Sequence, residues 1–226
     1  MMHIEFHTLK TSHCPEFQEL LAIYHDAFPP EERQPDSILQ ENIDSGLSRA
    51  FIATDKNSVI FFLHAYDVPQ TNLVFLDYAA THPSYRGKQI CRCFFEQAFS
   101  LFGHDRILFC QQEDPNYGQN RTVKRQRLTY FGSMGFQLLH NVPYMLPDHS
   151  GGTAITPMVL CAMAQDSLSM LPGQLIANAI RFIFIQVYRR NEDDELLHQN
   201  LCVIPNEIAL FEPLSPSRVN PAVVRK

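Results

Sequence analysis

The spacing of apolar residues predicts a strand and two helices near the start of the chain. Met2–Leu9 alternates apolar and polar side chains, which is the pattern of a half-buried strand. Pro15–Phe28 places apolar side chains three and four residues apart, so it is predicted to be an amphipathic helix. Asp36–Ser45 is predicted to be a second helix, with Gly46 as its stop signal.

Six strands and two helices are predicted between residues 50 and 163. The predicted strands are a meander of three, a buried strand and two closing strands: Ala50–Thr54, Ser58–Val68, Leu73–Thr81, Ile107–Gln111, Phe136–Leu139 and Thr156–Met163. The predicted helices between them are Lys88–Phe102 and Val123–Met134, each followed by a glycine. Strands before a helix, followed by strand–helix–strand, are typical of an α/β fold with a mixed sheet.

The composition changes after residue 164. Leu171–Arg190 is a strongly apolar segment that predicts a helix, and Asn191–Glu195 is acidic. Pro205–Lys226 contains four prolines, so we expect it to be irregular. We therefore divide the chain into a domain of residues 1–164 and a C-terminal extension of residues 165–226 that packs on the domain or on a partner.

Charge and cysteine content narrow the function classes. A formal net charge of −6 argues against a nucleic-acid binder, and it fits either solubility alone or a preference for cationic acceptors such as amines. The six cysteines follow no disulfide framework and no signal peptide precedes them, so we expect reduced thiols and a cytoplasmic protein.

A metal site and a membrane span are not expected either. Cys91-Arg92-Cys93 is too tight for the usual zinc pair, and we expect no metal. The apolar run Phe182–Tyr188 is too short for a membrane span.

The most informative segment is Leu73–Phe102, in which an apolar strand leads through a short turn into a helix. Free backbone N–H groups and the positive end of a helix dipole at such a turn suit phosphate. The turn resembles the acetyl-CoA pyrophosphate loop of the Gcn5-related N-acetyltransferase (GNAT) superfamily, R/Q-x-x-G-x-G/A. Arg86 fits its first position, whereas Gln89 and Cys91 replace its two small residues. A left-handed Gln89 would cost about 1–2 kcal/mol, and in a helical conformation only its bulk would matter.

Further phrases resemble the same superfamily, in its order and spacing, from about Glu16 to Met163. They are the loop phrase AFPPEER, the fifth strand and its exit, a counterpart of FYEKLGF, and two closing strands: Ala27–Arg33, Phe109–Pro115, Thr129–Phe136, Tyr144–Pro147 and Pro157–Leu160. The resemblance implies a GNAT-like acyl-CoA N-acyltransferase fold with a C-terminal helical extension. It implies transfer of an acetyl group from acetyl-CoA to an amine of a small molecule or protein.

The resemblance also implies where acetyl-CoA binds. Backbone of the fourth strand, at a bulge, would hold the pantetheine arm, and the loop would hold the pyrophosphate. These residues are Ala79, Ala80, Thr81, Arg86, Gly87, Lys88, Gln89, Ile90 and Cys91. The replaced glycines leave a second hypothesis open, a non-catalytic acyl-CoA-binding or interaction protein on the same fold. A homodimer formed through the extension is a further possibility.

Acyl transfer to an amine requires a base, since a free alkylamine has a pKa of about 10.4. Asp77 and Glu113, near the ends of two neighbouring strands, are the candidates; each also fits a salt-bridged strand end. Tyr130 is a candidate acid, but Phe131 occupies the register of the superfamily's tyrosine, and adjacent helical side chains diverge. In the superfamily the loop that holds Glu31, Glu32 and Arg33 lines the acceptor pocket, although a charged turn between helices explains it equally simply.

Overall fold

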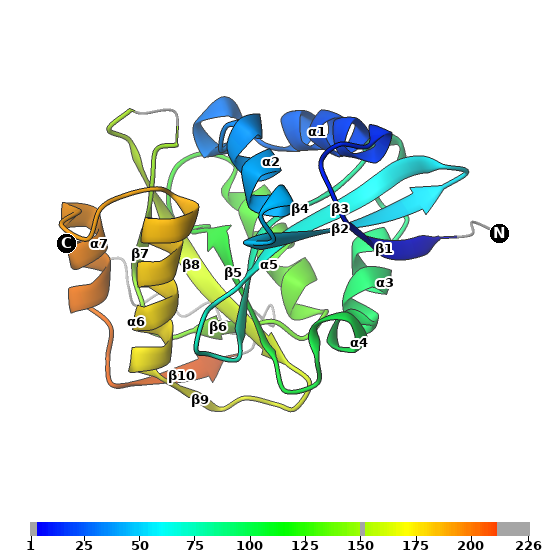
Figure 1. The fold of residues 1–226 in the computed structure, drawn as a ribbon. Coiled ribbons are helices and arrows are strands. Elements are labelled where there is room, and N and C mark those ends of the chain that lie inside the picture. Colours follow the sequence, from blue (N-terminus) through cyan, green and yellow to red (C-terminus); the bar gives the residue numbers. More distant parts are fainter. Residues whose placement is uncertain (1–3, 150–151, 212–226) are drawn as a thin grey trace.

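A ten-stranded mixed sheet runs through the molecule in the computed structural model, which describes residues 4–149 and 152–211 (Figure 1). The strand order is β1-β2-β3-β4-β5-β8-β6-β10-β9, and β7 pairs with β8 beside this path. β4 and β5 are parallel, and the other pairs are antiparallel. The strands are β1 (Glu5–Leu9), β2 (Ser48–Asp55), β3 (Ser58–Asp67), β4 (Leu73–Thr81), β5 (Ile107–Glu113), β6 (Gln137–Leu139), β7 (Tyr144–Pro147), β8 (Ile155–Ala164), β9 (Met170–Pro172) and β10 (Glu207–Phe211).

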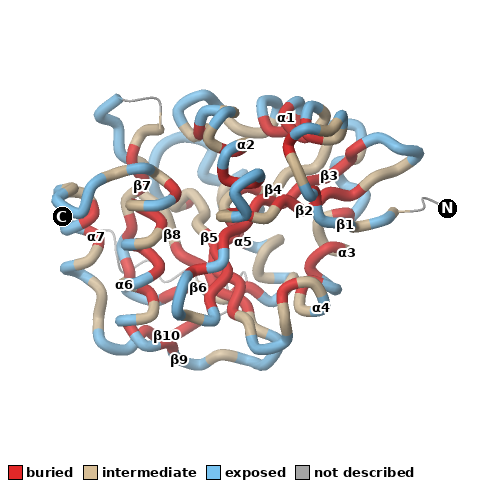
Figure 2. The backbone as a smooth tube through the Cα atoms, in the orientation of Figure 1, coloured by how far each residue is buried: buried red, intermediate tan, exposed pale blue. Residues whose placement is uncertain are grey.

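Helices cover both faces of the sheet. One face, called the α1 face, carries α1 (Pro15–Ala27), α2 (Asp36–Asp44) and α6 (Gly173–Phe182). The other, the α3 face, carries α3 (Ile90–Glu96), α4 (Ala98–Phe102) and α5 (Arg121–Gly132). The remaining helical segments are short: η1 (Pro30–Glu32), η2 (Pro83–Tyr85), the π-helical turn η3 (Ile183–Val187) and α7 (Glu195–Cys202). Burial is greatest along the central strands, between the two helical layers (Figure 2).

A β-bulge reverses the direction of the side chains part-way along β4. His64 pairs with Tyr78 and Ala65 with Leu76, so Asp77 is an extra residue on β4. Residues two apart in an unbroken strand share a face. Here Leu76 packs on the α3 face and Tyr78 on the α1 face. The bulge that we expected at Ala79–Thr81 therefore lies earlier, at Asp77.

The same point of the sheet is where β4 and β5 separate. Their ladder ends at the pair Leu76–Cys110. Beyond it, β4 continues beside β3 as far as Thr81, and β5 continues beside β8 as far as Glu113. The two strands therefore diverge in the middle of the sheet, and the bulged Asp77 is the first residue of β4 after the last pair. We call this opening the splay.

The predicted central helix Lys88–Phe102 is wrong in its start and its continuity. Gln89 has φ 62°, a left-handed conformation that no α-helix contains, so α3 begins only at Ile90. The helix is interrupted at Gln97, whose backbone N–H donates to Phe94 O. The side-chain amide of Gln97 takes the place of that N–H and donates to Cys93 O at 3.1 Å. The carbonyl of Cys93 therefore keeps a hydrogen-bond donor, although the backbone N–H of Gln97 has turned away from it and the helix is broken there.

The C-terminal extension differs most from the prediction. Leu171 belongs to a strand and pairs with Ile208, so the predicted helix Leu171–Arg190 begins two residues later. The expected irregular segment contains β10, which joins the sheet between β6 and β9. Asp194, within the acidic stretch, caps α7 by accepting a hydrogen bond from Leu197 N at 2.9 Å, and Glu195 is the first residue of that helix. Residues 212–226, which hold three of the four prolines, lie outside the described residues, as do Met2 and His3 of the first predicted strand.

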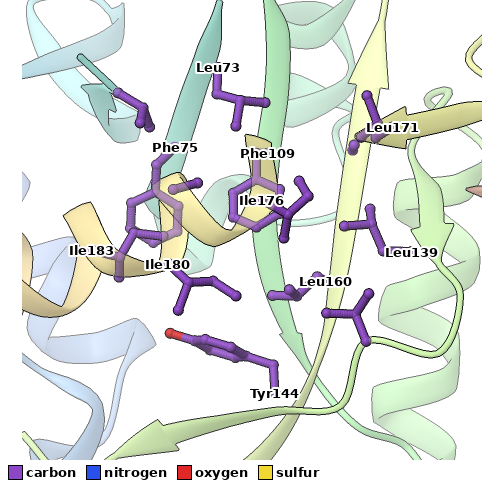
Figure 3. Close-up of a cluster of buried hydrophobic side chains, with 14 of the residues drawn as sticks. Leu73, Phe75, Phe109, Leu139, Tyr144, Leu160, Leu171, Ile176, Ile180 and Ile183 are labelled. Carbon is purple, nitrogen blue, oxygen red and sulfur yellow. The ribbon is translucent and has the colours of Figure 1, made fainter. Parts of the chain in front are cut away.

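The extension shares a hydrophobic cluster with the central sheet. Ile176, Ile180 and Ile183 lie against Phe75 of β4 and Phe109 of β5, and the cluster reaches β10 (Figure 3). Burying side chains of this size contributes about 1.5–3 kcal/mol each. The boundary at residue 164 stays a prediction, as does a dimer. None of the described helices has both the length and the apolar character needed to cross a bilayer.

Candidate acyl-CoA and acceptor site

The loop after β4 borders a cavity of about 200 Å³. Its lining comprises Thr81, Tyr85, Arg86, Gly87, Gln89, Ile90, Cys91 and Tyr130. Six of the nine residues predicted to bind acetyl-CoA therefore surround one cavity, and the candidate acid Tyr130 joins them. Ala79 and Ala80 lie outside the lining and pack towards opposite faces of the sheet. Lys88 also lies outside it, with its ammonium group 4.3 Å from the ring centre of Tyr85.

The backbone of this loop has the strained geometry expected of a phosphate-binding turn. Gly87 has φ 77° and Gln89 has φ 62°. Glycine adopts such angles without strain, whereas a left-handed glutamine costs about 1–2 kcal/mol. The Gln89 side chain is held by Arg92, whose Nε donates to Gln89 Oε1 at 3.2 Å. The left-handed alternative for Gln89 is thus the one that the structure adopts.

Arg86, which matches the first position of the loop signature, is held by two contacts. Its guanidinium forms an ion pair with Asp26 of α1, and its Nε donates to Thr81 O at 3.3 Å. About half of the Arg86 side chain remains exposed. The guanidinium therefore links α1 to the loop, and an anionic ligand in the cavity would compete with Asp26 for it.

Tyr130 and Phe131 point in different directions, as the helical geometry predicts. Phe131 packs in the α3-face core, with its ring centre 5.2 Å from that of Phe136. Tyr130 lines the cavity, and burial, followed by the neighbouring Cys91, raises the pKa of its phenol. Burial also raises the pKa of the Cys91 thiol to about 12, so Cys91 is not a reactive thiolate. Phe131 cannot donate a proton, and Tyr130 is the phenol that this helix presents to the cavity.

Asp77 occupies the bulge and is almost fully buried. Its carboxylate Oδ2 accepts a hydrogen bond from Gln34 Nε2 at 3.1 Å and lies 3.4 Å from His64 Nδ1. His64 Nε2 in turn lies 2.8 Å from Ser48 Oγ. A carboxylate on the first residue beyond the last β4–β5 pair is placed to act on a group held in the splay. Gln34, His64 and Ser48 were not predicted as site residues, because none of them belongs to a recognisable motif.

The carboxylate of Glu113, the second candidate base, forms salt bridges with two cationic side chains. Lys124 Nζ lies 2.8 Å from its Oε1 and Arg127 Nη1 lies 3.1 Å from its Oε2. Both cations come from α5, and the Glu113 side chain is 21% exposed. Each oxygen of Glu113 therefore already has a cationic partner, which is the salt-bridged arrangement that the sequence left open.

The loop that contains Glu31, Glu32 and Arg33 lies across the α1 face near the splay. Tyr78 Oη donates to Glu32 O at 2.9 Å and accepts from Gln34 N at 3.2 Å. Burial, followed by the charge of Glu113, raises the pKa of Glu32. His149 N, from the connection between β7 and β8, donates to Glu31 O at 3.1 Å. Arg33 is half-buried and ends η1 by donating its N–H to Pro30 O.

No family model matches the chain, and no curated protein sequence matches it either. Solved structures match most of the arrangement of strands and helices. A protein from Bacteroides thetaiotaomicron assigned to the GNAT family of acetyltransferases superposes with a TM-score of 0.68 at 21% identity, over 83% of this chain and 99% of that one. The chain has the GNAT fold.

Two further structures with this fold are shorter than the present chain. Ribosomal-protein-S18-alanine N-acetyltransferase from Escherichia coli has a TM-score of 0.51 at 15% identity, over 73% of this chain and 97% of that one. An aminoglycoside 6'-N-acetyltransferase complexed with coenzyme A has a TM-score of 0.52 at 14% identity, over 72% and 98%. The resemblance seen in the sequence and the mixed α/β GNAT-like fold are therefore confirmed. At these identities the GNAT fold alone is shared, and a fold hosts more than one function.

Within residues 4–149 and 152–211, no three His, Cys, Asp or Glu side chains come together in a group that could hold a metal ion.

Proposed function

We propose that the protein is an acyl-CoA-dependent N-acyltransferase that transfers an acetyl group from acetyl-CoA to an amine. The observation that carries the proposal is the splay. It places a buried carboxylate, a β-bulge and a cavity lined by the Arg86–Cys91 loop along one continuous strand and turn.

The loop fits the phosphates of coenzyme A by the chemistry of its groups. First-turn N–H groups of a helix have no partner within the helix, and the left-handed Gly87 and Gln89 turn the backbone ahead of α3. Arg86, half-exposed at the cavity, adds a positive charge. Backbone of β4 from Asp77 to Ala80 lies beside β3 on one side and has no β5 partner on the other, so the polar groups on that open side are available to the pantetheine arm.

In this proposal Asp77 is the base. Acetyl-CoA supplies a thioester whose carbonyl carbon is open to attack by a neutral amine. The Asp77 carboxylate accepts the proton that the amine loses as its nitrogen bonds to that carbon. Gln34 and His64 orient the carboxylate, and the leaving thiolate can recover a proton from solvent or from Tyr130, which borders the cavity. Glu113 is less suited to take a proton, since both of its oxygens face cations.

Binding is tested first, by calorimetry with CoA and with acetyl-CoA. Gly87→Glu should abolish binding, because the added carboxylate enters the cavity that holds the pyrophosphate. Gly46→Glu is a matched control: Gly46 has φ 75°, Gly87 has φ 77°, and neither has an atom within 4 Å of a built Cβ. Both variants therefore introduce the same backbone strain and charge. Equal CoA affinity in the two variants would reject the loop as the binding site.

The second candidate function is acyl-CoA binding without catalysis. Phe131 at the register of the superfamily's tyrosine, together with Gln89 and Cys91 in the loop, favours it. Release of free thiol from acetyl-CoA in the presence of a primary amine separates the two functions. CoA binding without amine-dependent thiol release would support the non-catalytic protein. The amine acceptor, small molecule or protein, is left to such a screen, with Glu31, Glu32 and Arg33 proposed as part of its pocket.

A further inference from the structure

The C-terminal extension reaches the splay through Tyr188, the residue that follows the π-helical turn η3. Its hydroxyl lies 2.7 Å from Gln111 Nε2 and 3.1 Å from Gln111 Oε1. Gln111 is the first residue of β5 after the last β4–β5 pair. Phe109, two residues earlier, packs on the α1 face, so the Gln111 side chain belongs to the same face as Tyr78. The extension therefore places a phenol at the β5 side of the opening whose β4 side holds Asp77.

Other polar groups converge on the same place from separate elements. Tyr144 Oη of β7 lies 3.3 Å from Gln111 Nε2. The ring of His149, whose backbone N–H bridges to Glu31, lies with its centre 4.5 Å from that of Tyr188. Burial, then Tyr144 and then the charge of Asp77 raise the pKa of Tyr188, so the phenol keeps its proton at neutral pH. Four uncharged polar groups therefore gather at the β5 side of the splay, opposite the Asp77 carboxylate. They are the phenols of Tyr144 and Tyr188, the carboxamide of Gln111 and the imidazole of His149.

A second contact fixes the extension against α2 and so fixes the position of Tyr188. Arg189 Nη2 donates to Asn42 Oδ1 at 2.9 Å, and Asn42 Nδ2 donates to Tyr66 Oη at 2.9 Å. Asn42 is fully buried. Arg189 has φ 55°, so the chain turns sharply directly after Tyr188. Both the π-helical turn and this left-handed residue are features that cluster at functional sites.

We propose that the C-terminal extension forms one wall of the acceptor site and that Tyr188 is a specificity-determining residue that contacts the acceptor. The inference rests on the proposed N-acyltransferase function. Tyr188 and Gln111 both donate and accept hydrogen bonds and carry no charge. The wall therefore suits a primary amine that carries a hydroxyl or amide group near the amino group. A site built to hydrogen-bond such a group rejects an analogue that lacks it, because its polar groups are then left unpaired.

The test compares ethanolamine with n-propylamine, which differ by a hydroxyl in place of a methyl group. The wild type should prefer ethanolamine in kcat/KM, and Tyr188→Phe should reduce this preference about ten-fold or more, through the KM for ethanolamine. The KM for acetyl-CoA should not change. Gln186→Ala, at an exposed position in the same π-helical turn, is the control and should retain the preference. Gln111→Met is a second variant that should act like Tyr188→Phe.

The outcomes separate the two proposals. No preference in the wild type, or a preference that survives both Tyr188→Phe and Gln111→Met, overturns the role of Tyr188 while leaving the acyltransferase intact. A loss of kcat accompanied by a large drop in melting temperature, with KM unchanged, assigns Tyr188 a structural role and also overturns it. A wild type that binds CoA but acetylates neither amine, nor any other amine in a screen, rejects the proposed function itself and the inference with it.

Discussion

His64 connects the carboxylate of Asp77 to the hydroxyl of Ser48, with Nδ1 3.4 Å from Asp77 Oδ2 and Nε2 2.8 Å from Ser48 Oγ. The three residues come from three adjacent strands and are almost fully shielded from solvent. Their order resembles a hydrolase triad, but the direction is reversed. Asp77 of β4 lies at the splay, whereas Ser48 lies on β2, two strands from β4, where it pairs with Tyr66 of β3. In the proposed function the carboxylate is therefore the reactive end of the set, and His64 is a positioning residue.

His64→Leu should lower the rate of acyl transfer, because the Asp77 carboxylate loses a polar partner 3.4 Å away that holds its orientation. His64→Asn can place an amide near the former Nδ1, so it should restore much of the rate. Steady-state kcat and melting temperature of both variants provide the measurement. Equal rates for the Leu and Asn variants would show that His64 only fills space.

Asp77→Asn should reduce kcat by about 100- to 10,000-fold, the usual range for loss of a general base. Glu113→Gln should reduce kcat far less, because Lys124 and Arg127 already engage both oxygens of Glu113. Steady-state rates across pH 6–9 provide the measurement, with CoA affinity as the control for folding. The reverse ranking of the two variants would transfer the role of base to Glu113.

Gln89→Gly should stabilise the protein by roughly 0–1.6 kcal/mol. Relief of the left-handed strain gains about 1–2 kcal/mol, and the greater freedom of glycine in the unfolded chain offsets about 0.4–1 kcal/mol of it. Gln89→Ala is the matched comparison, since it removes the side chain but keeps the strain. If CoA binding tightens equally in both variants, side-chain bulk limits affinity; if it tightens only in Gln89→Gly, strain does.

Glu32→Gln should raise the melting temperature at neutral pH but not at pH 4. Burial and the charge of Glu113 raise the pKa of Glu32 above 4.5, so the folded state holds the proton more tightly than the unfolded state. Stability of the wild type therefore falls as the pH rises from 4.5 through the folded pKa, and the glutamine variant lacks this loss. Glu31→Gln, at an exposed neighbour, is the control. A pH-independent difference would contradict the assignment.

Tyr130→Phe should lower turnover only a few-fold. The Tyr130 phenol borders the cavity, but it comes from a helix position one residue before the superfamily's tyrosine. Loss of an essential acid would typically cost about 100- to 10,000-fold. A loss of three orders of magnitude with unchanged CoA affinity would establish Tyr130 as the general acid.

The mixed α/β layout could be predicted because long strands and amphipathic helices carry their own periodicity, and the GNAT-like fold because several phrases of the sequence resemble the superfamily in its order. Leu73–Thr81 and the helix that begins at Pro15 match the structure closely. The break at Gln97 could not be predicted, since it depends on one side-chain hydrogen bond to Cys93 O. β10 and α7 were also missed. A five-residue strand and an eight-residue helix in a proline-containing tail are too short for their periodicity to stand out.

The site was predictable where a motif spans a local turn, and not where distant elements meet. The Arg86–Cys91 loop is local, and most of it lines one cavity. Gln34, His64 and Tyr188 lie near the splay only because the loop after η1, β3 and the extension pack together there. No spacing rule within the chain relates residue 64 to residue 188. The roles of all these residues stay predictions until the variants above are measured.

The position of β10 has a consequence for biosynthesis. It is the last strand along the described chain, yet it lies between β6 and β9, and Leu210 pairs with Leu139, far earlier in the sequence. Such distant pairing slows folding, because a long loop must close before any contact compensates for its entropy. During synthesis on the ribosome, β10 cannot pair with β6 until residues 207–211 have emerged. Until then, β6 exposes an unpaired edge. The partly formed sheet is therefore open to aggregation and to chaperone capture until the C-terminal extension has been synthesised.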